Sequence, residues 1–354
     1  MGPRASEWLQ SGAFFEWTPA EGGGSPLRVF HTELGDAGAP TLLLLHGFPT
    51  SSIDWYEMAG LLAGEHRVCM LDFPGFGFSD KPRDGGYSLQ RDRGLVEHYA
   101  REILGAESVA VIAHDRGDSV ALAFAERCSS PDAGFELRHL VLSNGNMFLP
   151  LSNLTGFQRL ILDPASAPTV LEALTPEMLA AGMGQTTFTP PRSPQDPEVA
   201  ALADTFAHND GVAVLHETIQ YLVERSQNER GWLDALAASA VPTTLVWGLY
   251  DTVSPLRVAA HIWEAFLAQK PGANEFWLLP RANHYLQNDQ PQEFVEVIHS
   301  SLSEGSPEPG ALSDVDGSPV FIDRSRRELP SAAEVLAQPA SLETLERDAA
   351  RLEG

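Results

Sequence analysis

Short, unbroken apolar runs recur along the chain, and stretches with apolar residues at helical spacing separate them. Runs without apolar–polar alternation, bounded by Gly, Pro or Asp, are typical of parallel strands that helices cover on both faces. The pattern therefore predicts an α/β protein with a wound, mostly parallel sheet. The predicted strands are residues 42–45, 68–71, 109–113, 140–142, 244–247 and 276–279.

The pattern changes between residues 147 and 236, where apolar side chains such as Leu215 and Ile219 follow a helical period and no strand is evident. This stretch is predicted to be a helical insertion, or cap. Its proline-rich segment 189–194 is expected to be an extended connection between two groups of helices.

The C-terminal stretch is rich in Gly, Pro, Ser and acidic residues, so we expect an appended, partly disordered tail with weak helical periodicity over 333–352. The predicted organisation is a core in two parts, residues 1–146 and 237–303, with the helical cap at 147–236 and the tail at 304–354.

Composition narrows the classes of function. Asp and Glu number 48 against 23 Lys and Arg, a net charge of −25 that disfavours binding to nucleic acid or to anionic membranes. No basic start precedes an apolar stretch, and no run approaches the roughly 20 apolar residues that span a bilayer, so neither secretion nor membrane insertion is expected. With only Cys69 and Cys128, the sequence predicts no disulfide framework and a cytoplasmic location.

Three polar residues directly follow predicted strands: Asp115, Asp251 and His284. The carboxyl ends of parallel strands share one edge of a sheet, where ligands bind, so these distant residues can converge. Their chain order of nucleophile, acid and histidine is the order used by α/β-hydrolases. We therefore predict a catalytic triad, in which aspartate stands where those enzymes usually carry serine.

An aspartate nucleophile suits a particular chemistry. A serine must lose a proton before it attacks, whereas a carboxylate is already ionised near neutral pH and can attack a saturated carbon directly. The product is an ester on Asp115, which His284 would cleave by activating water while Asp251 orients the imidazole. Epoxides, haloalkanes and haloacids are the implied substrates. Asp115 could instead cap a helix and Asp251 a loop, with Asn144 marking an alternative acid position.

Backbone donors for the developing oxyanion are predicted at two positions. The segment "HGFP" leaves a strand and would place the Phe48 N–H beside that of Arg116. The Arg116 side chain could itself simply pair with an acid. The further substrate-binding candidates are His46, Trp55, His114 and Tyr285. His46 and His114 are also suited to bracing their loops by hydrogen bonds, and Trp55 is also suited to packing.

Four motifs in order, "HGFP", "LDFPGFGFSDKP", "HDRG" and "NHYLQNDQP", resemble the epoxide hydrolase and haloalkane dehalogenase branch of the α/β-hydrolase superfamily over roughly residues 26–303. The resemblance is closest to the mesoderm-specific transcript proteins, which share "HGFPTSSIDWY", "LSNG" and the "NDG…QY" pattern. It implies the α/β-hydrolase fold with an inserted helical cap.

The same resemblance also helps to distinguish between the candidate substrate classes. Haloalkane dehalogenases place tryptophan after the aspartate, where this chain has Arg116, and haloacetate dehalogenases carry a second arginine where it has Ser119. Epoxide hydrolases use two cap tyrosines as proton donors, and Tyr221 matches the second. Because it is the only tyrosine in the predicted cap, either one donor suffices or a histidine such as His208 or His216 takes the other place.

The sequence therefore predicts an epoxide hydrolase that converts an apolar epoxide to a diol. The alternatives are a haloalkane or haloacid dehalogenase, and a non-catalytic ligand-binding protein of the same fold. No metal or organic cofactor is expected, since the chain supplies nucleophile, base and oxyanion donors. The expected partners are a small hydrophobic substrate and water, with no nucleic acid and no membrane. The oligomeric state stays open, a homodimer being one alternative.

Overall fold

The computed structural model describes residues 1–20, 25–83, 85–130, 132–303 and 317–324. Their strands form a nine-stranded sheet in the order β1-β2-β4-β3-β5-β6-β7-β8-β9. Neighbours from β4 to β8 pair in parallel, whereas the pairs β1-β2, β2-β4 and β8-β9 are antiparallel. The strands are β1 (Gly12–Trp17), β2 (Leu27–Leu34), β3 (Thr41–Leu45), β4 (Arg67–Leu71), β5 (Ser108–His114), β6 (Glu136–Ser143), β7 (Thr243–Gly248), β8 (Asn274–Leu279) and β9 (Val320–Arg324).

The six predicted apolar runs lie in β3 to β8, which confirms the predicted parallel sheet. Sequence reasoning missed the three antiparallel strands at the two edges. One of them, β9, falls in the segment predicted to be an appended tail, and it pairs antiparallel with β8. The predicted helical periodicity over 333–352 lies outside the described residues.

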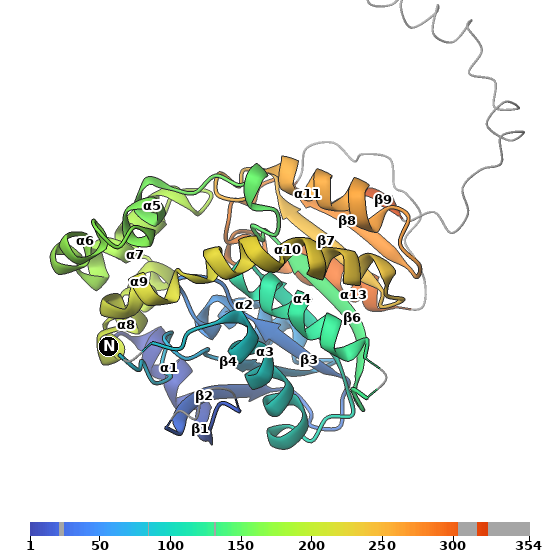
Figure 1. Cartoon of the computed structure of the whole chain (residues 1–354), viewed down its shortest axis with the longest axis horizontal. Helices are drawn as coiled ribbons and strands as arrows, with labels where there is room; N and C mark the ends of the chain where they lie inside the picture. The colour runs from blue at the N-terminus through green and yellow to red at the C-terminus, as the bar shows by residue number, and fades with distance from the viewer. Residues whose placement is uncertain (21–24, 84, 131, 304–316, 325–354) are drawn as a thin grey trace, which may run out of the picture.

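Helices pack on both faces of the sheet. Helix α4 contacts α3 and α10, and α2 contacts α13. In Figure 1, α4 and α10 cross in front of the sheet while α13 lies behind it. The helices outside residues 147–238 are α1 (Pro3–Ser11), η1 (Ser52–Trp55), α2 (Tyr56–Leu62), α3 (Leu89–His98), η2 (Tyr99–Ile103), α4 (Arg116–Cys128), α11 (Leu256–Ile262), η5 (Trp263–Leu267), α12 (Leu286–Asp289) and α13 (Pro291–Leu302).

Residues 147–238 contain helices and connections but no strand. Helices α5 to α9 gather at one end of the molecule, and α10 returns from there across α4 (Figure 1). The proline-rich segment 189–194 connects α7 to α8, as the sequence predicts. The helices of this region are η3 (Leu149–Leu151), α5 (Gly156–Leu162), α6 (Ala167–Ala173), α7 (Pro176–Thr186), α8 (Pro197–Ala207), η4 (His208–Val214), α9 (Leu215–Thr218) and α10 (Tyr221–Ala238).

Both cysteines are free thiols, Cys69 buried in β4 and Cys128 at the end of α4. Burial raises the pKa of each thiol to about 12. Within the described ranges, every helix is too short or too polar to cross a bilayer.

Candidate active site

The chain makes a strained turn between β5 and α4. Asp115 occupies this turn with φ 50° and ψ −109°, a backbone conformation that is rare for a residue with a side chain. Two glycines allow the surrounding backbone to come close. A Cβ at Gly117 would lie 2.5 Å from the carbonyl oxygen of Leu45, and one at Gly47 would lie 2.8 Å from Cβ of Asp115. The glycines of the "HG" and "RG" pairs, Gly47 and Gly117, thus both allow the close approach of backbone at this one turn.

The Asp115 carboxylate is buried, and its two oxygens have different surroundings. Oδ2 accepts a hydrogen bond of 3.0 Å from the backbone N–H of Phe48, whereas Oδ1 has no partner among the described residues. Arg116 begins α4, so its N–H is one of the helix N-terminal donors without an intrahelical acceptor. The Arg116 side chain turns away to pair with Asp92 of α3, which is the acid partner left open by the sequence.

His284 and Asp251 meet at the same edge of the sheet. Nδ1 of His284 lies 3.0 Å from Oδ2 of Asp251, and both side chains are buried. The other carboxylate oxygen of Asp251 accepts from the backbone N–H groups of Val253 and Ser254 at 2.8 and 2.9 Å. Asp251 therefore braces its loop and contacts the histidine at once. Burial alone would lower the pKa of His284, but the Asp251 carboxylate and the negative charge of Asp115 raise it above its ordinary value.

The alternative acid position has a different place in the structure. Asn144 follows β6 with φ 49°, and its Nδ2 donates to the carbonyl oxygens of Asn283 and His284 at 2.8 and 2.9 Å. Its Oδ1 accepts from the N–H of Gly248 at 2.8 Å. Asn144 thus fixes the backbone that carries the histidine.

Tyr221 at the start of α10 is buried beside the nucleophile turn, and its ring centroid lies 5.8 Å from that of Phe48. Its hydroxyl has no hydrogen-bond partner within the described part of the chain. Burial and the Asp115 charge raise the pKa of Tyr221, and the nearby guanidinium groups of Arg225 and Arg116 oppose this increase.

The two histidines proposed as an alternative proton donor lie elsewhere. Nδ1 of His216 lies 2.6 Å from the carbonyl oxygen of Ile161, and the His208 ring packs 5.1 Å from that of Phe78. The contacts of His216 and His208 are thus with the Ile161 backbone and the Phe78 ring, and no contact between either histidine and Asp115 or His284 is among those of the described residues.

Of the remaining substrate-binding candidates, some hold loops or pack in the core and others adjoin the cavity described below. His46 contacts the carbonyl oxygen of Gly47 at 2.8 Å through Nδ1 and accepts from the N–H of Phe73 at 3.0 Å through Nε2, and burial lowers its pKa to about 3. Trp55 is buried against Phe294. Neither residue lines the cavity.

His114 and Tyr285 adjoin the histidine of the site. The His114 ring is buried with its centroid 5.0 Å from that of His284 and 5.1 Å from that of Tyr285. The Tyr285 hydroxyl donates to the carbonyl oxygen of Phe48 at 3.3 Å. Tyr285 lines the cavity, whereas His114 does not and packs against the two rings.

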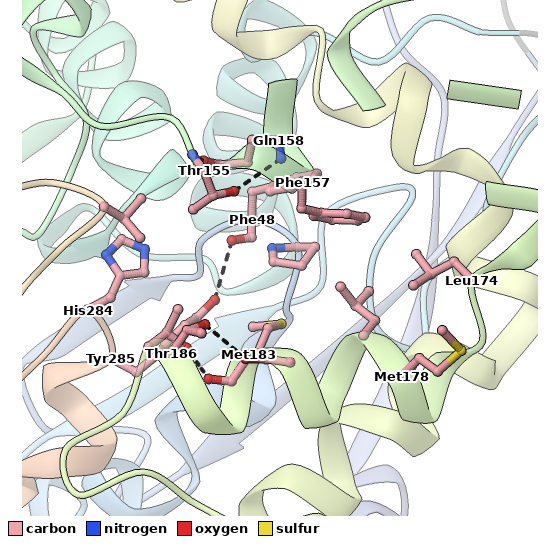
Figure 2. A pocket seen from close by; sticks show the side chains of 15 residues that line it. Phe48, Thr155, Phe157, Gln158, Leu174, Met178, Met183, Thr186, His284 and Tyr285 are labelled. Carbon is pink, nitrogen blue, oxygen red and sulfur yellow. Dashed lines mark hydrogen bonds between the residues drawn. The ribbon is translucent and has the colours of Figure 1, made fainter. Parts of the chain in front are cut away.

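An apolar cavity of about 370 Å³ opens between the sheet edge and helices α5 and α7. Figure 2 shows His284 and Tyr285 at one end and Leu174 and Met178 at the other. Sequence reasoning missed this wall because its residues resemble ordinary core positions of amphipathic helices. The lining residues on these helices and their connections include Phe157, Leu174, Met178, Leu179, Gly182 and Met183.

Arg225 of α10 is a second residue that sequence reasoning missed. Its side chain is fully buried, with Nε donating to Oγ of Ser119 at 2.5 Å and Nη2 to the backbone carbonyl of Asp115 at 3.2 Å. The available signal was its position four residues after Tyr221, which places both side chains on one face of a helix.

The sheet order, the strained turn after β5 and the Asp–His pair after β7 and β8 define a class of protein. Residues 40–291 match the alpha/beta hydrolase fold family, and the chain belongs to that family as a hydrolase of this superfamily. It is 32% identical over 302 residues to the mesoderm-specific transcript homolog protein of Bos taurus, covering 84% of this chain and 87% of that one.

Solved structures agree on the fold. An alpha/beta hydrolase fold protein from Burkholderia ambifaria aligns with a TM-score of 0.64 and 25% identity, covering 81% of this chain and 99% of the other. The haloalkane dehalogenase DbeA from Bradyrhizobium elkani aligns with a TM-score of 0.64 and 23% identity, covering 81% and 96%.

Proposed function

We propose that this chain hydrolyses epoxides that carry an apolar chain, through a covalent ester on Asp115. The observation that carries the proposal is the Asp115 carboxylate at the strained turn. One of its oxygens is held by the Phe48 N–H at 3.0 Å, and the other has no partner among the described residues. A carboxylate held by one oxygen is oriented while the other stays available for attack.

The first step opens the epoxide. The free oxygen of Asp115 forms a bond to one epoxide carbon, the C–O bond at that carbon breaks, and the released oxygen takes the hydroxyl proton of Tyr221. The result is an ester on Asp115, a neighbouring alcohol, and a Tyr221 phenolate beside the guanidinium groups of Arg116 and Arg225. Their Cζ atoms lie 5.5 and 4.9 Å from the Tyr221 ring centroid, which supports stabilisation of that phenolate.

The second step cleaves the ester. His284 takes a proton from water, and the hydroxide attacks the Asp115 carbonyl carbon, whose oxygen is stabilised by the N–H groups of Phe48 and Arg116. Collapse breaks the ester C–O bond, and the diol oxygen takes the proton that the hydroxide carried. The proton on His284 then returns to the Tyr221 phenolate. The net change is epoxide plus water to diol.

The substrate class follows from the cavity. Its walls on α5 and α7 are mostly aliphatic and aromatic, with Gln158 and Thr186 as polar members, and it extends away from His284 toward Leu174 and Met178 (Figure 2). An uncharged electrophile with an extended apolar chain matches such walls, because burying the chain removes apolar surface from water.

Trapping of the ester tests the proposal. The His284→Gln variant is incubated with styrene oxide and with straight-chain terminal epoxides, digested, and analysed by mass spectrometry. We expect the peptide containing Asp115 to gain the full mass of the epoxide, because ring opening expels no group. His284→Gln combined with Asp115→Asn should gain no mass, whereas His284→Gln combined with Glu126→Gln, changed at an exposed position of α4, should gain it.

The same experiment separates the alternatives. A haloalkane or haloacid would add its mass less that of the hydrogen halide and release halide into solution. Adducts from halides alone would replace the epoxide proposal with dehalogenation. Adducts from neither class, with wild-type protein producing no diol, would overturn both.

A further inference from the structure

Arg225 joins the cap to the nucleophile turn. It lies on α10, and this helix packs against α4, which begins directly after Asp115. Its guanidinium makes contacts with three parts of the site: Oγ of Ser119 at 2.5 Å, the carbonyl oxygen of Asp115 at 3.2 Å, and the Tyr221 ring, whose centroid lies 4.9 Å from Cζ.

The charge of Arg225 is unusual in its surroundings. The side chain is fully buried, yet none of the ion pairs formed by the described residues includes it, and Nη1 has no hydrogen-bond partner there. A buried cation without a paired carboxylate is costly in free energy, so a protein retains one where the charge has a use. The acidic side chains that interact with its charge are Asp118 at the turn and Glu229 on its own helix. At Asp115 its partner is the backbone carbonyl oxygen.

Its contacts are placed to act on the reacting groups. The Asp115 backbone holds its strained, positive-φ conformation because its surroundings enforce it, and the bond from Nη2 to the Asp115 carbonyl is one such restraint. The guanidinium also packs on the Tyr221 ring, with Cζ 4.9 Å from the ring centroid, and so restrains the ring that carries the hydroxyl. Both effects come from one side chain of the cap.

We infer that Arg225 is a positioning residue, supplied by the cap, that holds the Asp115 turn and the Tyr221 hydroxyl in their reactive arrangement. The inference rests on the proposed function for its catalytic consequence, but not for its effect on the turn. In this arrangement the geometry of the Asp115 nucleophile depends on how α10 packs against α4.

The test uses the full chain with Arg225→Lys, Arg225→Met and Arg225→Ala, and the matched control Arg230→Met. Arg230 lies on the same helix but pairs with Asp234 at the surface, where its side chain is 74% exposed. Hydrogen exchange of peptides spanning residues 111–120 reports on the turn without any substrate. The rate of ester formation with a straight-chain epoxide, measured by rapid quench and mass spectrometry, reports on reactivity.

We expect Arg225→Met to exchange at least about tenfold faster at the turn and to form the ester about a hundredfold more slowly, with little change in KM. Arg225→Lys should recover part of the rate. Low millimolar guanidinium should restore ester formation in Arg225→Ala, which a role limited to helix packing would not allow. Arg230→Met should match wild type in every measurement.

A folded Arg225→Met variant with wild-type exchange at the turn and a wild-type rate would overturn the inference. If Arg225→Met and Arg225→Ala fail to fold, Arg225→Lys is compared with wild type in hydrogen exchange at the turn and in the rate of ester formation. Wild-type values in both would then overturn the inference. If the wild-type protein forms no ester with any epoxide, the proposed function is refuted. Faster exchange at the turn in Arg225→Met would then still support the role of Arg225 at the turn.

Discussion

Nδ1 of His284 lies 3.0 Å from Oδ2 of Asp251, across 33 residues of sequence. This contact fixes which imidazole nitrogen carries the hydrogen, so that Nε2 is left to accept a proton. The second oxygen of Asp251 is held by two backbone N–H groups, which keeps the carboxylate from rotating away. The pair therefore has the geometry that a base directed toward the cavity requires.

The raised pKa of His284 gives a prediction for the pH dependence of turnover. The imidazole acts as a base only when neutral, so ester hydrolysis should increase as pH rises through this pKa. Asp251→Asn removes the main group that raises the pKa. We expect the acidic limb of the kcat profile to move to lower pH, and the plateau to fall by about a hundredfold or more. Asp234→Asn on the exposed face of α10 is the control, and an unmoved limb in Asp251→Asn would count against His284 as the base.

Stability should report the same ion pair without substrate. Because the pKa of folded His284 is raised, the pair contributes stability below the ordinary histidine pKa, and the contribution is lost as pH rises through the raised value. Asp251→Asn should therefore lower the free energy of unfolding more at about pH 5 than at about pH 9. Urea denaturation at both values measures this, and an equal loss would contradict it.

Asn144 should not tolerate aspartate. Asn144→Asp would direct a carboxylate oxygen at the two carbonyl oxygens that Nδ2 now binds, in a buried site. We expect a loss of roughly 2–4 kcal/mol in the free energy of unfolding and a lower rate, since the His284 backbone would shift. Asn153→Asp is the matched control, because Asn153 is exposed and its Nδ2 bonds a single carbonyl oxygen. Equal stability of the two variants would show that Asn144 does not fix the histidine loop.

The sequence predicted most of the sheet but not its edges. The central strands are buried on both faces, so their apolar runs are visible in the sequence, as in β3 with all five residues buried. Strand β9 is only partly buried and carries Asp323 and Arg324, and its position depends on pairing with β8. Pairing between distant segments leaves little local signal.

The candidate active site likewise has a part that could be predicted from the sequence and a part that could not. Asp115, Asp251 and His284 follow recognisable strands, so their convergence at one edge could be predicted. Arg225 and the cavity wall come from cap helices, and which helical face meets the sheet is decided by tertiary packing. His208 and His216, the alternatives for the other cap proton donor, likewise lie on cap segments whose packing the sequence does not reveal.

The glycines of the nucleophile turn should differ from other glycines of the chain. Gly117→Ala would place Cβ 2.5 Å from the carbonyl oxygen of Leu45, so backbone must move. We expect a loss of about 2 kcal/mol or more in the free energy of unfolding, together with lower activity. Gly94→Ala in α3 meets nothing within 4 Å and should stabilise by about 0.5–1 kcal/mol. Thermal and urea unfolding of both variants measure this, and a neutral Gly117→Ala would refute the close approach.

Gly182 offers a test of how the cavity selects its substrate. This residue of α7 lines the cavity, and an added Cβ would meet nothing within 4 Å, so a larger side chain has room to extend. Leucine also favours a helix interior more than glycine, which protects the fold of the variant. Gly182→Leu should therefore shorten the cavity without unfolding the cap.

The expected result of Gly182→Leu depends on the length of the substrate. If the apolar chain of the epoxide lies along α7, excluding two or three methylene groups from burial costs about 0.8 kcal/mol each, so kcat/KM for long-chain epoxides should fall about tenfold or more. Short epoxides that reach only His284 and Tyr285 should react as with wild type. Gly94→Leu, the same change on α3 away from the cavity, is the control. A uniform loss across all chain lengths would mean that the substrate does not occupy this cavity.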